Sequence, residues 1–142
     1  MLNRRMKLTA VLVLVFVLLM GMAALGAEPY FKVKLGLFDR LVCLALLPPE
    51  GSFATLKIIR DLQMELAPTE EEAKAAGLEN DPVNGSTTAT GWDIVPEKEI
   101  IFGDIAKSII VKALEKLDQE EKLTPQHILL YELFIEDKKE GD

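Results

Sequence analysis

The chain has very few of the residue types on which most catalytic and metal sites depend. Its 142 residues include one cysteine, Cys43, one histidine, His127, and one tryptophan, Trp92. A single cysteine excludes an intramolecular disulfide, and one Cys with one His cannot supply the four ligands of a structural zinc site. The domain must therefore fold by packing alone, and we expect it to hold no metal and no cofactor.

The scarcity of nucleophiles and bases also argues against covalent catalysis. Cys43 lies in the apolar run 41–45, which favours a buried thiol acting as a small apolar side chain. An intermolecular disulfide is the other interpretation. His127 follows Pro125 in the first turn of a predicted helix, where we expect partial exposure. A Cys43–His127 dyad would need a chance tertiary approach, and no nucleotide or hydrolase motif occurs. We predict no catalytic residues and no enzymatic activity.

Positive charge is scarce as well. The chain has 16 Lys and Arg against 23 Asp and Glu, and the three basic residues before Leu8 leave a net charge of −10 on the remainder. Because affinity for phosphate depends on clustered basic residues, we expect no binding to nucleic acid. The exception is the segment 28–60, which has five basic and three acidic residues and includes Lys57 and Arg60.

Residues 1–27 have the organisation of an export segment. Arg4, Arg5 and Lys7 precede an apolar run from Leu8 to Ala27. This order predicts either a cleaved signal peptide or an N-terminal membrane anchor, because about 20 apolar residues are enough to cross a bilayer. Both interpretations place the domain outside the cytoplasm, with membrane contact only through residues 8–27. A mis-called N-terminus on a cytoplasmic protein is the third interpretation.

The remainder, 28–142, is one domain's worth of chain, and its pattern predicts a mainly α (α+β) fold of about five helices with one short β-hairpin. Proline, glycine and capping residues delimit the helices. The predicted helices are 35–47, 52–66, 69–77, 105–121 and 124–135.

Strand signals are weaker than helix signals. Trp92–Val95 and Ile100–Phe102 are expected to pair as the hairpin around Pro96. Residues 30–34 alternate weakly, as a short strand or as the lead into a helix. Residues 79–91 are predicted to be a polar loop, and 137–142 a charged tail.

The last predicted helix has more apolar residues than one face of a surface helix can bury. It is therefore either central to the domain or packed against another subunit. Together with Lys57 and Arg60, which lie three residues apart on the predicted helix 52–66, it supplies a candidate interaction surface. The residues of this surface are Ile128, Tyr131, Phe134, Ile135, Lys57 and Arg60.

Two long blocks resemble a group of small uncharacterised proteins of bacteriophage and prophage genomes. They are KVKLGLFDRLVCLALLPPEGSFATLKIIRDL (32–62) and EKEIIFGDIAKSIIVKALEKLDQEEKLTPQHILLYELFIE (97–136), with the acidic TEEE turn (69–72) between them. The resemblance implies a bacterial or phage origin and a helical domain, but no reaction. The chain departs from that group in its export segment.

These features predict a non-enzymatic binding or assembly protein, exported or membrane-anchored, with a protein partner or self-association. Two alternatives stay open. One is a small extracytoplasmic hydrolase that uses acidic residues, although a glycosidase needs a cleft lined with aromatics and the chain has a single Trp. The other is a cytoplasmic phage interaction module.

Overall fold

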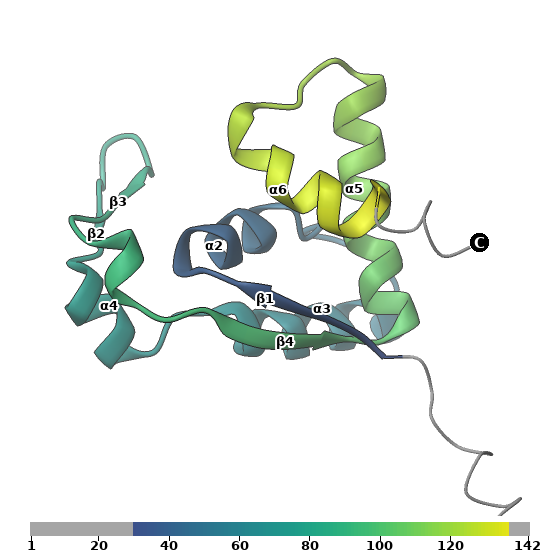
Figure 1. The fold of residues 1–142 in the computed structure, drawn as a ribbon. Coiled ribbons are helices and arrows are strands. Elements are labelled where there is room, and N and C mark those ends of the chain that lie inside the picture. The colour runs from purple at the N-terminus through teal and green to yellow at the C-terminus, as the bar shows by residue number, and fades with distance from the viewer. Residues whose placement is uncertain (1–29, 137–142) are drawn as a thin grey trace, which may run out of the picture. The chain divides into compact units, whose positions relative to one another are not determined.

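The computed structural model describes residues 30–136, and the predicted export segment 1–27 and charged tail 137–142 lie outside that range. The described part is mainly helical with a small antiparallel sheet, which confirms the predicted α+β class (Figure 1). In chain order the elements are β1 (Phe31–Leu35), α2 (Leu37–Ala45), α3 (Phe53–Leu66), α4 (Glu70–Ala76), β2 (Glu79–Asn80), β3 (Thr87–Thr88), η2 (Trp92–Ile94), β4 (Lys98–Phe102), α5 (Asp104–Gln119), η3 (Pro125–His127), α6 (Ile128–Tyr131) and η4 (Glu132–Glu136).

The main sheet pairs a strand at the start of the described chain, β1, with a strand about 65 residues later, β4. β1 runs antiparallel to β4, with Phe31 opposite Phe102 and Val33 opposite Ile100. The predicted hairpin was therefore wrong: residues 92–94 form the 3-10 turn η2, and the partner of β4 is the weakly alternating strand β1. Both strands bury every second residue, and this shared alternation lets them cover one face of the core together.

The core lies under the inner face of this sheet. α2 packs against β1 and α3, α3 against α5, and the C-terminal segment against α2 and α5. These contacts enclose one main buried cluster. Its members are Val33, Leu35, Val42, Cys43, Leu62, Leu66, Ile100, Phe102, Ala106, Ile110, Leu114, Leu130 and Phe134.

The helix boundaries follow the predicted caps. Ser52 accepts a hydrogen bond from the N–H of Thr55 at the start of α3. Thr69 and Glu72 form the predicted capping box of α4, and Gly77 ends that helix at φ +62°. A side chain at position 77 would meet the Thr90 hydroxyl as well as an unfavourable backbone angle, so glycine is required there.

The segment 79–91, predicted to be a polar loop, contains a short strand pair and several turn hydrogen bonds. Glu79 and Asn80 pair with Thr88 and Thr87 as a two-residue ladder. Asp81 and Asn84 each accept a backbone N–H two residues further on, which is ordinary turn chemistry. A second small cluster of Leu37, Ala76 and Val95, with Leu78, Ala89 and Trp92 around it, fixes both ends of this segment to α2.

The C-terminal segment is helical throughout but irregular. It passes from a 3-10 turn (η3) through one α-turn (α6) to a π-turn (η4) within residues 125–136. Leu130 and Phe134 are fully buried, whereas Ile128 and Leu129 are exposed, so the position of this segment in the core explains only part of its apolar excess. Between residues 30 and 136, no helix has the length and apolar character needed to cross a membrane.

Candidate functional site

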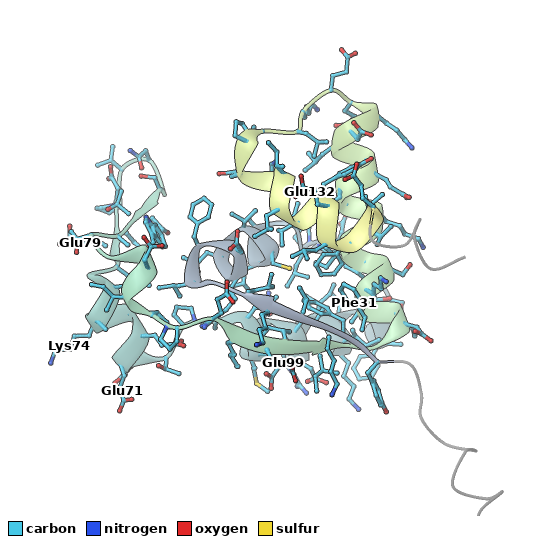
Figure 2. All side chains as sticks on the ribbon, in the orientation of Figure 1. Phe31, Glu71, Lys74, Glu79, Glu99 and Glu132 are labelled. Carbon is cyan, nitrogen blue, oxygen red and sulfur yellow. The ribbon has the colours of Figure 1, made fainter. Side chains whose placement is uncertain are left out.

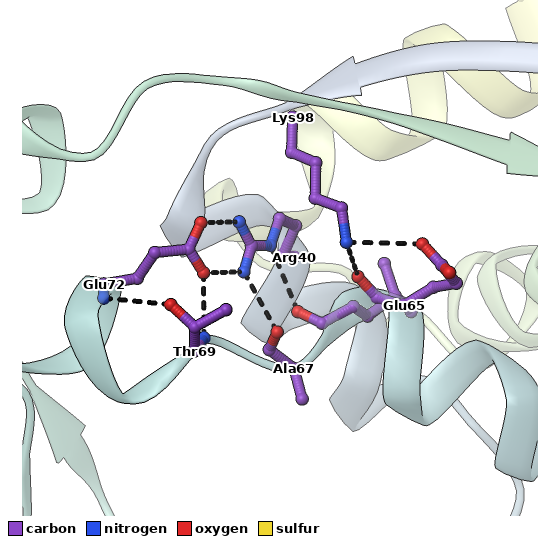
Figure 3. A network of polar contacts seen from close by, with 7 residues as sticks. Arg40, Glu65, Ala67, Thr69, Glu72 and Lys98 are labelled. Atoms are coloured by element: carbon purple, nitrogen blue, oxygen red, sulfur yellow. Dashed lines mark hydrogen bonds and ion pairs between the residues drawn. The ribbon is translucent and has the colours of Figure 1, made fainter.

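A buried arginine is the most connected polar group of the described chain. The Arg40 side chain has no exposed surface, and its Nη1 and Nη2 donate to the two Glu72 carboxylate oxygens at 2.9 and 2.7 Å (Figure 3). Its Nε and Nη2 also donate to the carbonyl oxygens of Leu66 and Ala67, both at 3.1 Å. These carbonyls end α3, so Arg40 joins α2, the end of α3 and the start of α4.

This ion pair is structural. Four hydrogen bonds to protein groups occupy the guanidinium, and this leaves little capacity for a ligand. Hydrogen bonds from Arg40 lower the pKa of Glu72 to about 2 against the opposing effect of burial, and the N–H of Thr69 and the charges of Arg40 and Lys98 add to the lowering. Lys98 supports the same junction by donating to the carbonyl oxygen of Glu65 at 2.8 Å. Nothing near Arg40 in the sequence indicates this pairing, because Glu72 lies 32 residues away.

The lowered pKa of Glu72 predicts a defined acid sensitivity. The unfolded carboxyl titrates near its usual 4.5, whereas the folded one titrates at about 2. The stabilisation is therefore complete above pH 5 and is lost as the pH falls toward 2. We expect Glu72→Gln to lower the free energy of unfolding at pH 7 and to match wild type more closely at pH 2.5. Urea titrations of both proteins at several pH values measure this. An unchanged difference across that range would contradict the assignment.

Cys43 and His127 do not form a dyad in the described structure. The Cys43 thiol is fully buried, and burial with the nearby Asp39 charge raises its pKa to about 12. No hydrogen bond joins it to His127 among residues 30–136. A neutral, enclosed thiol is not a nucleophile, so the interpretation of Cys43 as a small apolar core residue is confirmed.

His127 is buried, and the expected partial exposure was therefore wrong. Its Nδ1 accepts the backbone N–H of Thr124 at 3.0 Å, which fixes the neutral ring with the proton on Nε2. Burial lowers the pKa of His127, in agreement with that neutral form. Fully enclosed side-chain nitrogens and oxygens all have partners within residues 30–136. No hydrogen bond of Nε2 is made within residues 30–136.

A shallow pocket of about 180 Å³ opens beside this histidine. Its lining comes entirely from the turn before η3 and from the irregular C-terminal segment. The lining residues are Leu123, Thr124, His127, Ile128, Tyr131, Glu132 and Glu136. The lining is mostly apolar, and Figure 2 shows Glu132 on this segment. The π-turn η4 supplies both carboxylates, and π-turns are frequent at functional sites.

The charge around the pocket is negative. The Tyr131 hydroxyl donates to Asp118 at 2.9 Å. This bond, with burial and the charges of Asp118, Glu115 and Glu136, raises the pKa of Tyr131. Carboxylates from α5 and η4 therefore lie near the Tyr131 hydroxyl. The arrangement suits an apolar group flanked by a cation.

The candidate surface predicted from sequence divides into four parts. Ile128 and Tyr131 line the pocket. Phe134 is fully buried and cannot meet a partner in the folded domain, so its inclusion was wrong. Ile135 is partly buried against the core and does not line the pocket. Lys57 and Arg60 are exposed on α3, away from this segment.

Family models, curated proteins and solved structures all give no match to this chain.

The predicted surface missed five of the residues that line the pocket, which are Leu123, Thr124, His127, Glu132 and Glu136. The i, i+4 spacing of the two glutamates on a helix was the available signal, but a solvated acidic face gives the same spacing. Within the described residues 30–136, no group of three or more His, Cys, Asp or Glu side chains is placed to hold a metal ion.

Proposed function

We propose that this protein is a non-enzymatic binding or assembly protein, which uses the pocket of residues 123–136 to hold a side chain of a protein partner. The size of the pocket is the observation that carries the proposal. Sites for small molecules usually enclose about 300–1,000 Å³, whereas this pocket measures about 180 Å³ and is open at one side. A volume of that size suits one large apolar side chain.

The lining supports a protein partner of a particular composition. Leu123, Ile128 and the Tyr131 ring offer apolar contact, and Ile128 is 56% exposed although it is apolar. Glu132 and Glu136 at the pocket favour a basic residue next to the inserted side chain. An aromatic or aliphatic anchor inside a pocket, with charged residues around it, is the usual organisation of an energetically important contact.

A variant at Ile128 tests this function. Because Ile128 is exposed, Ile128→Asp should leave the fold intact but place a third carboxylate in the pocket. We expect partners recovered with the full chain from cells, quantified by mass spectrometry, to fall about tenfold or more. Val83→Asp, at a 92% exposed position in the 79–91 segment, is the matched control. Equal recovery from both variants would exclude the pocket as the binding site.

We also propose that residues 8–27 take the protein to a membrane and place the domain outside, and that it has a phage or prophage origin. The order of charged and apolar residues supports the first part, and the blocks 32–62 and 97–136 support the second.

Fractionation of cells that express the full chain, with mass spectrometry of the N-terminus, tests the location. A product that starts at Ala27 or Glu28 indicates export, and an intact chain in the membrane fraction indicates an anchor. An intact chain in the soluble fraction would contradict both and favour the cytoplasmic alternative.

A further inference from the structure

The outward face of α3 combines exposed apolar side chains with two basic ones. Phe53 is 87% exposed and Met64 is 69% exposed, and both are large apolar residues. Lys57 and Arg60 lie exposed between them. The steps of four, three and four residues from Phe53 to Met64 keep all four side chains on one side of the helix. Leu56, 40% exposed, adjoins them.

This face carries basic and apolar side chains, although the described chain as a whole is acidic. Residues 30–136 contain 19 acidic and 11 basic side chains. One of the basic ones, Arg40, is buried. Arg60 has only a loose ion pair with its neighbour Asp61, at 3.6 Å, and Lys57 has no ion pair within the described range. The α3 face therefore has both the apolar surface and the positive charge that the C-terminal pocket would favour.

The spacing of the two cations on α3 is similar to the spacing of the two carboxylates on η4. Lys57 and Arg60 are three residues apart on α3, and Glu132 and Glu136 are four residues apart on η4. Each pair is thus separated by about one helical turn, 5–6 Å. Phe53 and Met64 lie one turn beyond the two cations, so a large apolar side chain can enter the pocket while the cations meet the carboxylates.

One chain cannot make this contact with itself. Phe53 and Met64 are exposed and the pocket is open in the described chain, so the two surfaces do not contact each other there. In Figure 1 α3 lies behind β4, whereas α6 lies above β1 in the view. The two complementary surfaces are therefore available to different copies.

We propose that the α3 face of a second copy of this chain, formed by Phe53, Leu56, Lys57, Arg60 and Met64, occupies the C-terminal pocket. This inference rests on the proposed function, because it names the partner of the same pocket. Two copies that exchange this contact reciprocally form a two-fold dimer, and copies that make it head to tail form a ring or an open chain.

Charge reversal in the full chain tests this pairing. The association of each protein, in the same detergent micelle, is measured by light scattering after gel filtration. The two test variants are K57E/R60E and E132K/E136K. K112E/K116E, at exposed positions of α5, reverses as much charge as K57E/R60E and serves as the control. Residues 8–27 are the same in all samples, so any association through them does not affect the comparison between variants.

We expect each test variant alone to self-associate about tenfold or more weakly than wild type, and their equimolar mixture to assemble again. The control should behave as wild type. Loss of assembly in E132K/E136K but not in K57E/R60E would overturn the α3 assignment and leave the pocket as a binding site. A wild-type chain that is monomeric in this assay would also overturn the inference, and partner recovery with Ile128→Asp would then decide the proposed function separately.

Discussion

Arg40→Ala should lower the free energy of unfolding by about 3–5 kcal/mol. The variant leaves the Glu72 carboxylate without its cation, and leaves two carbonyl oxygens at the end of α3 without their donor. The loss is large because the fully buried Arg40 side chain leaves a cavity and the two carbonyl oxygens lose their donor, whereas Glu72 is partly exposed. Chemical unfolding followed by the fluorescence of Trp92, whose ring packs edge-on against Phe38, measures this loss.

The matched control for Arg40 is Arg60→Ala. Arg60 is largely exposed, and its contact with Asp61 is long, so we expect a change within about 0.5 kcal/mol. The double variant R40A/E72A should be less destabilised than the sum of the single variants, since it removes both charges of the pair together. Equal small effects at positions 40 and 60 would contradict the structural role of the Arg40–Glu72 pair.

Phe134→Ala should be similarly destabilising, by about 3–5 kcal/mol. The Phe134 ring has no exposed surface and lies 5.0 Å from the Phe31 ring and 5.1 Å from the Phe102 ring, measured between centroids. Its removal opens a cavity between the C-terminal segment and the sheet. The same unfolding measurement reports it.

Ile128→Ala is the control for Phe134, because it truncates an exposed apolar residue of the same segment. We expect its stability to stay within about 0.5 kcal/mol of wild type. A C-terminal segment that served only as a partner surface would give the opposite order, with little effect of Phe134→Ala on the isolated chain.

Sequence predicted best the features that depend on neighbours along the chain. The Thr69–Glu72 capping box, the Ser52 cap and the glycine end of α4 each involve residues within about two turns of one another, so their spacing alone determines them. The exposure of Lys57 follows from the same helical period.

The features that sequence missed depend on residues far apart in the chain. β1 and β4 have similar alternation, but no local signal showed that they pair across about 65 positions. Arg40 and Glu72 are 32 residues apart, and each has an ordinary local interpretation. Burial of His127 depends on how the turn before it folds back on the core.

Only part of the pocket, Ile128 and Tyr131, could be predicted from the sequence, for the same reason. The apolar excess of 124–135 indicated something unusual, but it could not separate Phe134, which faces the core, from Ile128, which faces outward. The change from α-turn to π-turn alters which residues share a face, and a regular helical period does not anticipate it.

The most direct test of binding through the C-terminal pocket is photo-crosslinking in cells. A photoreactive amino acid is placed at position 128 in the full chain, and in a second protein at position 83, which is more exposed and distant along the chain. We predict one or a few discrete protein adducts from position 128 and none of them from position 83. The same adducts from both positions, or none from position 128, would contradict a binding function for this pocket.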